Sequence, residues 1–282
     1  MQLLVMLALA LGLMLVAIFV SVPFVLVDGG QMSASTMRWV QAVTQVLTFA
    51  LPVILMTIIY YRHRQREYYR LDFSGRRWYY ALVGVVVMLL LTPLNEWLTE
   101  WNDAWQLGQL GDALRRMQES TEAIMEQLLG TSTVGGLLAN LVVIAIVPAV
   151  CEELFFRAGI QNLLQRWISA DGRKPWGVHV AIWLTALIFS LGHGEIFAFM
   201  PRFVMGAMLG YLYVYGGSIL PNMLAHCVNN AIVVVLYWLV ARGVLDIDPE
   251  APFGFGFWIT LCCTVAALIL FAVTFFSRQR QK

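Results

Sequence analysis

Charged residues are scarce in this chain. Only 12% of its 282 residues are Asp, Glu, Lys or Arg, whereas 60% are hydrophobic. Because a soluble domain has about 25% charged residues, this composition excludes a soluble globular fold. The formal net charge of +1 gives no reason to expect a nucleic-acid partner. The composition predicts an all-α, polytopic membrane protein that is surrounded by membrane lipid.

Several signatures of known chemistry are also missing. The four cysteines lie in apolar segments without a CxxC spacing, so we expect inert packing residues rather than disulfides or zinc ligands. The chain contains no HExxH zinc motif, no GxSxG serine motif and no GxGD aspartyl motif. The serine and aspartyl classes of intramembrane protease are therefore unsupported. We also see no pair of short, inverted spans of the kind that indicates a transporter.

Eight apolar segments are close to the roughly 20 residues that a membrane-spanning helix needs. They are about 3–27, 39–61, 79–95, 134–156, 176–193, 197–215, 219–240 and 255–276. The first segment lacks a clear cleavage site, so we expect a retained helix. Apolar residues recur at steps of three and four in 104–130, which predicts an amphipathic helix on the outer membrane surface. We treat residues 1–282 as a single transmembrane domain.

The loop charges predict how the chain is oriented. Basic residues crowd the loops after the second and fourth spans and the C-terminus, whereas the other loops hold most of the acids. With eight spans, the positive-inside rule predicts that both termini are cytoplasmic. Short apolar connections are typical of a prokaryotic protein, so we expect the prokaryotic cytoplasmic membrane.

Two adjacent carboxylates, Glu152 and Glu153, directly follow an apolar run. An ionisable residue within a membrane span is energetically costly and indicates a function. Glu153 and Arg157 are spaced i,i+4, which predicts an ion pair with a structural role. Glu152 lies about 100° further round the helix, so its carboxylate is left available for chemistry.

The fourth and fifth spans form a hairpin with arms of similar length. Helical arms from 152 to 168 and from 176 to 193 each extend roughly 24–26 Å from a turn at 169–175. Glu152 and His193 are therefore expected at the same height on neighbouring helices. We expect residues 1–100 to be scaffold and residues 134–240 to hold all the unusual polar groups.

The seventh span adds a polar stripe of Asn222, His226 and Asn230 at steps of four. Two chemistries suit these groups together with Glu152 and His193. In the first, Glu152 and His193 activate a water for attack on a peptide carbonyl, and His226 and Asn230 stabilise the oxyanion. In the second, Glu152, His193 and His226 bind a divalent metal that activates the water.

Three short motifs in this region resemble those of the CPBP family, which includes CAAX prenyl endopeptidases and the bacteriocin-processing or immunity proteins once named Abi proteins. EExxxR matches 152–157, FxxxH matches 189–193, and HxxxN matches 226–230. The three motifs occur in the family's order without departures. The resemblance covers about residues 134–235, a little over a third of the chain.

The resemblance implies an intramembrane protease core that needs no cofactor. By that likeness, Glu152 and His193 activate water, and His226 and Asn230 form the oxyanion site. Glu153, Arg157 and Phe189 support them. The implied substrates are CAAX-like peptides, other peptides or membrane proteins.

Two other functional classes stay open at this point. Some members of the family act without cleavage, so a membrane adaptor or a bacteriocin-immunity protein is the first alternative. A transporter is the second, if Glu152 and the histidines relay protons. Oligomeric state has no signal in the sequence.

Overall fold

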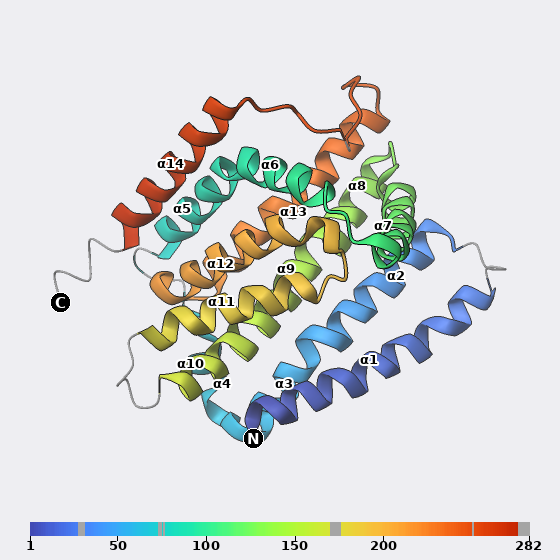
Figure 1. Ribbon diagram of the computed structural model, residues 1–282. Coiled ribbons are helices and arrows are strands. Elements are labelled where there is room, and N and C mark those ends of the chain that lie inside the picture. Colours follow the sequence, from blue (N-terminus) through green and yellow to red (C-terminus); the bar gives the residue numbers. More distant parts are fainter. Residues whose placement is uncertain (28–31, 73–74, 76, 170–175, 250, 276–282) are drawn as a thin grey trace.

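The computed structural model describes residues 1–27, 32–72, 75, 77–169, 176–249 and 251–275, and it arranges them as a bundle of helices (Figure 1). All regular elements among these residues are helical, which confirms the predicted all-α class. Helices are the expected solution for long apolar segments, because in lipid each backbone polar group must be satisfied within its own segment.

Six continuous helical stretches are long and apolar enough to cross a membrane. These stretches are α1 (Gln2–Val27); α2 (Ala34–Gln45) with η1 (Val46–Ala50) and α3 (Leu51–Tyr61); α8 (Val134–Asn140) through η3 (Leu141–Ile146), α9 (Val147–Glu153) and η4 (Leu154–Gln161) to α10 (Asn162–Ile168); η6 (Ile196–Ala198) with α12 (Phe199–Gly216); α13 (Leu220–Ala241); and α14 (Phe257–Phe275). A bent pair, α5 (Arg77–Leu90) with α6 (Thr92–Asp103), forms a seventh span if it is counted as one. The shorter apolar helix α11 (Trp176–Leu191) occupies the place of the remaining predicted span, so the arrangement agrees with about eight spans.

The helix that carries the adjacent carboxylates is continuous for 35 residues, from Val134 to Ile168. Two π-helical segments, η3 and η4, interrupt its α-helical hydrogen bonding on either side of α9. Such wide turns occur frequently at functional sites. Pro148, near the start of α9, has no N–H to donate to the carbonyl of Ile144 one turn earlier. The helix passes through this proline without ending, and the Ile144 carbonyl receives no hydrogen bond from residue 148.

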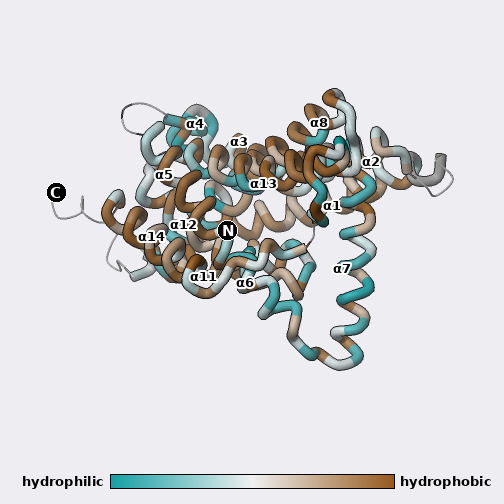
Figure 2. Tube along the Cα trace, turned by 90° about the horizontal axis from the view of Figure 1, so that it is seen from above, coloured by the Kyte–Doolittle hydropathy of each residue, from teal (hydrophilic) through white to brown (hydrophobic). Residues whose placement is uncertain are grey.

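The segment between the third and fourth predicted spans differs from the expectation. α5 ends at Leu90 rather than near residue 95, and the chain bends by 45° into α6, which the sequence analysis did not predict. Pro93 explains the new helix, since proline suits the first turn of a helix. The predicted amphipathic helix is present as α7 (Gly108–Leu129), a mostly exposed and hydrophilic helix at the side of the bundle (Figure 2).

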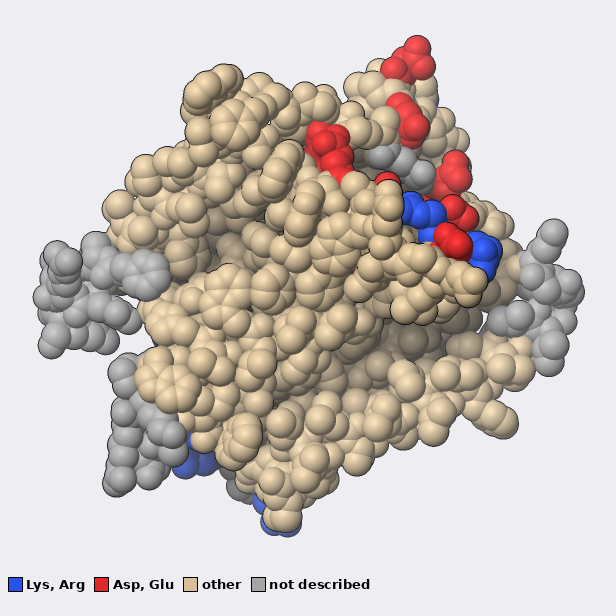
Figure 3. Space-filling view, in the orientation of Figure 1, with Lys and Arg blue, Asp and Glu red and all other residues tan. Residues whose placement is uncertain are grey.

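Charge is separated between the two ends of the bundle. Basic residues are visible at the end where the chain starts, whereas the visible acidic residues gather at the opposite end, together with some basic residues (Figure 3). We name the first end, which carries Arg62, Arg64, Arg66 and Arg70 in η2 (Arg62–Arg64), α4 (Gln65–Tyr69) and the residue after it, the arginine-rich end. The basic residues of 170–175 and 276–282 lie outside the described residues, as does the predicted hairpin turn after its first residue, Ser169. That the arginine-rich end faces the cytoplasm stays a prediction.

Small residues allow α11 and α12 to pack closely beneath the polar groups. A Cβ atom at Gly206 would lie 3.2 Å from the Cα of Ala186, and one at Gly210 would lie 2.8 Å from the side chain of Ile182. Glycines four residues apart, as here, are a known feature of close helix contacts in membranes. This contact positions Phe189, which is fully buried, near the end of α11.

Candidate active site

The neighbouring carboxylates of α9 have different partners. Both side chains are buried, and Glu152 and Glu153 are 6% and 0% exposed. Because successive residues of a helix point about 100° apart, the two carboxylates face different neighbours. The sequence analysis expected this division, with Glu153 paired and Glu152 available.

Glu153 belongs to a closed set of buried polar side chains. Arg157 Nε lies 3.1 Å from Glu153 Oε2, and Asn222 Nδ2 donates to the same oxygen at 3.2 Å. His226 Nδ1 lies 3.0 Å from Glu153 Oε1. We name Glu153, Arg157, Asn222 and His226 the Glu153 network. Both carboxylate oxygens are engaged, so Glu153 has little capacity left to activate a water.

Glu152 has the opposite character. Its Oε1 accepts one hydrogen bond, from Gln45 Nε2 at 3.3 Å. Its Oε2 has no hydrogen-bond partner among the described residues. That oxygen lies 3.8 Å from His193 Nε2 and 3.9 Å from His226 Nε2. These distances are too long for direct hydrogen bonds, and a contact of this length between polar atoms suits a bridging water.

His193 is held at the end of α11 with one nitrogen turned toward Glu152. Its Nδ1 lies 2.7 Å from the carbonyl oxygen of Phe189, one turn earlier. A carbonyl only accepts, so Nδ1 carries the proton, and in the neutral ring Nε2 is then an acceptor. The helix stops here because Gly194 adopts a positive φ of 72°, which suits glycine. The equal hairpin arms predicted this meeting of His193 and Glu152.

His226 connects the two carboxylates. Glu153 accepts from Nδ1 of this ring, which leaves Nε2 directed toward Glu152. The side chain of His226 is only 3% exposed, whereas that of His193 is 27% exposed. A substrate therefore has easier access to the His193 side of the site.

Asn230 lies beside this group without a direct contact to it. Its Nδ2 donates to the carbonyl of Ile144 at 3.4 Å, which is the carbonyl that receives no hydrogen bond from Pro148. Its Oδ1 accepts from Asn229 Nδ2 at 3.3 Å. The stripe on α13 places Asn230 one turn beyond His226, with its second N–H available for another acceptor.

Phe189 packs among residues of all three motifs. The ring lies with its centroid 4.7 Å from that of His193 and 6.1 Å from that of His226. The Arg157 guanidinium lies 5.2 Å from the ring centroid, a cation–π distance. Both Nη atoms of Arg157 are buried without a hydrogen-bond partner among the described residues. Phe189 therefore separates the buried cation from the histidines and holds their rings in place.

The metal alternative has no preformed ligand cluster within the described part of the chain. No three His, Cys, Asp or Glu side chains there are arranged to hold a metal ion. Glu152, His193 and His226 approach one another at distances of 3.8 and 3.9 Å between atoms. Addition of a chelator to the cleavage assay tests whether a metal takes part.

The sequence analysis missed two residues that contact the carboxylates. Gln45 donates to Glu152 from α2, so the expectation that residues 1–100 are only scaffold is wrong at this position. The sequence did hold a signal for Gln45. Arg38 lies seven residues earlier, on the same face of α2, and its Nε donates to Asn140 at 2.7 Å. Asn140 belongs to the same long helix as Glu152. Asn222 was placed in the polar stripe of α13 but not among the site residues, and it contacts Glu153.

Comparisons with known proteins agree with the motifs. A search of the curated proteins and a search of the solved structures each give no match. A family model, described as type II CAAX prenyl endopeptidase Rce1-like, matches residues 134–232. This segment contains Glu152, His193 and Asn230, and it excludes Gln45. The match confirms the resemblance that the three motifs indicated: residues 134–232 are similar to the type II CAAX prenyl endopeptidase family.

Proposed function

We propose that the protein is an intramembrane endopeptidase that hydrolyses peptide bonds of membrane-associated, CAAX-like or other peptide substrates. The family match supports a protease in general terms. The single observation that carries the finer proposal is the unpartnered Oε2 of Glu152, 3.8 Å from His193 Nε2 and 3.9 Å from His226 Nε2. In the proposal, one water bridges the carboxylate, which accepts its proton, and an imidazole nitrogen, which orients it.

In this proposal, Glu152 is the general base. A water bound between Glu152 Oε2 and His193 Nε2 gives one proton to Glu152 as its oxygen attacks the peptide carbonyl. The C=O bond becomes a C–O⁻ bond in a tetrahedral intermediate. When the C–N bond breaks, the leaving nitrogen takes the proton that Glu152 holds, and the first products are a carboxylic acid and an amine. The acid then gives its proton to the amine or to solvent.

His226 and Asn230 are proposed to stabilise the oxyanion. Asn230 has one N–H beyond the bond that it makes with Ile144. His226 donates from Nε2 only when both nitrogens carry protons, since its Nδ1 proton already faces Glu153. The carboxylates of Glu152 and Glu153, 3.9 and 3.0 Å from its two nitrogens, favour that imidazolium. Preorganised donors of this kind are usually a large source of catalytic stabilisation.

The test is cleavage of a fluorogenic CAAX-type peptide library by the purified protein in lipid, beside Glu152→Ala and with or without chelator. We expect cleavage that is lost in Glu152→Ala and unaffected by chelator. Loss with chelator that metal restores would replace the glutamate mechanism by a metal mechanism. Absence of cleavage of every peptide, by a protein that is folded, would favour the adaptor or immunity alternative.

A further inference from the structure

A second polar site lies at the arginine-rich end, away from the candidate active site. A cavity of about 300 Å³ is lined by Tyr61, Arg64, Glu67, Tyr68 and Arg166. These residues come from the end of α3, from η2 and α4, and from α10. At about 1.5 Å per residue, Arg166 lies about 20 Å along the long helix from Glu152. The cavity is therefore separate from the residues that are proposed to cleave peptides.

Tyr68 presents an unused donor to this cavity. The residue is only 3% exposed, and its hydroxyl has no hydrogen-bond partner among the described residues. A buried hydroxyl without a partner is energetically costly, so binding of an acceptor at this position is favourable. Burial raises the pKa of the Tyr68 phenol well above its usual value. The hydroxyl therefore keeps its proton at neutral pH and can donate it to an acceptor.

Arg166 supplies positive charge that no described carboxylate balances. Its Nη1 donates to the Tyr61 hydroxyl at 2.6 Å, and its guanidinium lies 5.4 and 5.1 Å from the ring centroids of Tyr61 and Tyr68. Within the described ranges, no carboxylate lies at ion-pair distance from Arg166. Arg64, in contrast, is paired with Glu67 at 3.0 Å. The described residues that line the cavity therefore carry a net positive charge, and two neutral aromatic rings hold the Arg166 guanidinium in place.

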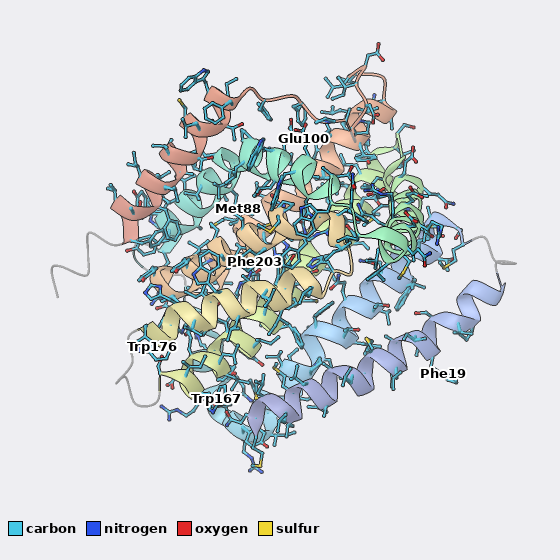
Figure 4. All side chains as sticks on the ribbon, in the orientation of Figure 1. Phe19, Met88, Glu100, Trp167, Trp176 and Phe203 are labelled. Atoms are coloured by element: carbon cyan, nitrogen blue, oxygen red, sulfur yellow. The ribbon has the colours of Figure 1, made fainter. Side chains whose placement is uncertain are left out.

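The surroundings of the cavity are those of a membrane surface. Trp167, next to Arg166, is 77% exposed and lies at the outside of the bundle (Figure 4). Trp176 at the start of α11 is also exposed at this end (Figure 4). Exposed tryptophans are typical of the boundary between lipid and water. The anion with the highest local concentration at that depth is the phosphate of a lipid headgroup.

We propose that this cavity binds the phosphate of an anionic lipid headgroup, with Arg166 as the charged contact and the Tyr68 hydroxyl as a second donor. Arginine suits this role because its planar guanidinium presents several donors to phosphate oxygens. The proposal is independent of peptide cleavage, so failure of the protease proposal does not affect it.

The experiment measures lipid binding rather than activity. The full-length protein is placed in nanodiscs of phosphatidylcholine with increasing phosphatidylglycerol, and retained lipid is counted by native mass spectrometry. The unfolding temperature is measured on the same samples. A parallel series in pure phosphatidylcholine receives inorganic phosphate, which separates a lipid headgroup from a soluble phosphate.

The variants remove one donor at a time. Arg166→Gln should weaken retention of phosphatidylglycerol by at least about tenfold, because a charge-assisted contact is lost. Tyr68→Phe should weaken it by about tenfold while the unfolding temperature without anionic lipid stays equal or rises, since only an unpartnered hydroxyl is removed. That combination separates a lost ligand contact from a damaged fold.

Arg242→Gln is the matched control. Arg242 is an exposed arginine that also lies against an aromatic ring, 5.2 Å from the centroid of Trp238. Arg242 follows the last residue of α13, whereas Ile219, just before the first residue, donates its N–H to the Arg70 carbonyl at the arginine-rich end. Arg242 therefore lies at the opposite end of α13 from the cavity. We expect its retention of lipid to equal that of the unmodified chain. Equal retention in Arg166→Gln and Arg242→Gln, or stabilisation by inorganic phosphate as strong as that by lipid, would overturn the lipid assignment.

Discussion

The two adjacent carboxylates of α9 differ in how many of their oxygens face a polar partner. On one side, the Glu153 network engages both oxygens of its carboxylate with buried donors. On the other side, Glu152 accepts one side-chain hydrogen bond, from Gln45, and within the described part of the chain its Oε2 has no partner and lies next to two histidines. A buried carboxylate with both oxygens engaged is suited to a structural role, whereas a buried carboxylate with an unused oxygen is suited to chemistry. Adjacent, identical residues thus support different roles.

The largest effect on stability is expected from removal of the Glu153 carboxylate. Glu153→Ala leaves Arg157 buried without its carboxylate, which should cost about 3–5 kcal/mol of stability and most of the activity. The measurement is thermal unfolding in lipid, together with the yield of folded protein from membranes. The double variant Glu153→Leu/Arg157→Met removes both charges and should recover much of the stability without activity. A Glu153→Ala protein as stable as the unmodified one would mean that the network is not structural.

The next largest effect is expected from Glu152, whose substitution should lower the cleavage rate without unfolding the protein. Glu152→Gln keeps the shape of the side chain and removes the proposed base, so the cleavage rate should fall by about 10²–10⁴-fold. Its unfolding temperature should stay close to that of the unmodified protein, because Glu152 makes only one hydrogen bond there. Single-turnover cleavage in lipid measures the rate. Full turnover by this variant would rule out Glu152 as the base.

Asn230 tests the proposed oxyanion site. Asn230→Ala should lower kcat by about 10²–10³-fold, the usual cost of one lost oxyanion donor. Asn229→Ala, which removes only a neighbour that donates to Asn230 at 3.3 Å, should have a clearly smaller effect. Steady-state kinetics of both variants on one peptide make the comparison. Equal effects of the two substitutions would argue against a direct contact of Asn230 with the oxyanion.

The smallest effect is expected at Gln45, which lies outside the residues matched by the family model. This substitution tests whether Glu152 depends on its one hydrogen-bond donor. Gln45→Leu removes the one donor to Glu152 Oε1 and should lower kcat by about tenfold with little change in KM. We infer a positioning role, since Gln45 acts through Glu152. Gln41→Leu, one turn earlier on α2, is the matched control and should leave kcat unchanged. An equal loss in both variants, or a loss confined to the unfolding temperature, would assign Gln45 to packing alone.

Regular helix geometry explains what could be predicted about the site. Glu152 and His193 lie on two arms of one hairpin, so a fixed rise per residue was enough to place them at the same height. The i,i+4 spacing likewise predicted the Glu153–Arg157 pair. Both arguments depend only on positions within single helices and on one connection between them.

Other features depend on how distant helices pack, which no local pattern in the sequence encodes. Gln45 meets Glu152 because α2 lies against α9, and the side-chain donor to the Ile144 carbonyl comes from Asn230 on α13. The helix α6 was missed because its acidic residues resemble a loop, although Pro93 is a proper helix-start signal. The cavity at the arginine-rich end combines α3, α4 and α10, and it was not visible in the sequence.

The most direct test of this account compares the two isosteric variants Glu152→Gln and Glu153→Gln in the same lipid, with the cleavage rate and the unfolding temperature measured for each. We predict that Glu152→Gln is folded, as stable as the unmodified protein and nearly inactive. We predict that Glu153→Gln unfolds at a clearly lower temperature, because Arg157 and His226 lose the charge that they face. An active Glu152→Gln protein, or a Glu153→Gln protein that keeps full stability and loses only its rate, would contradict the division of roles between the two carboxylates.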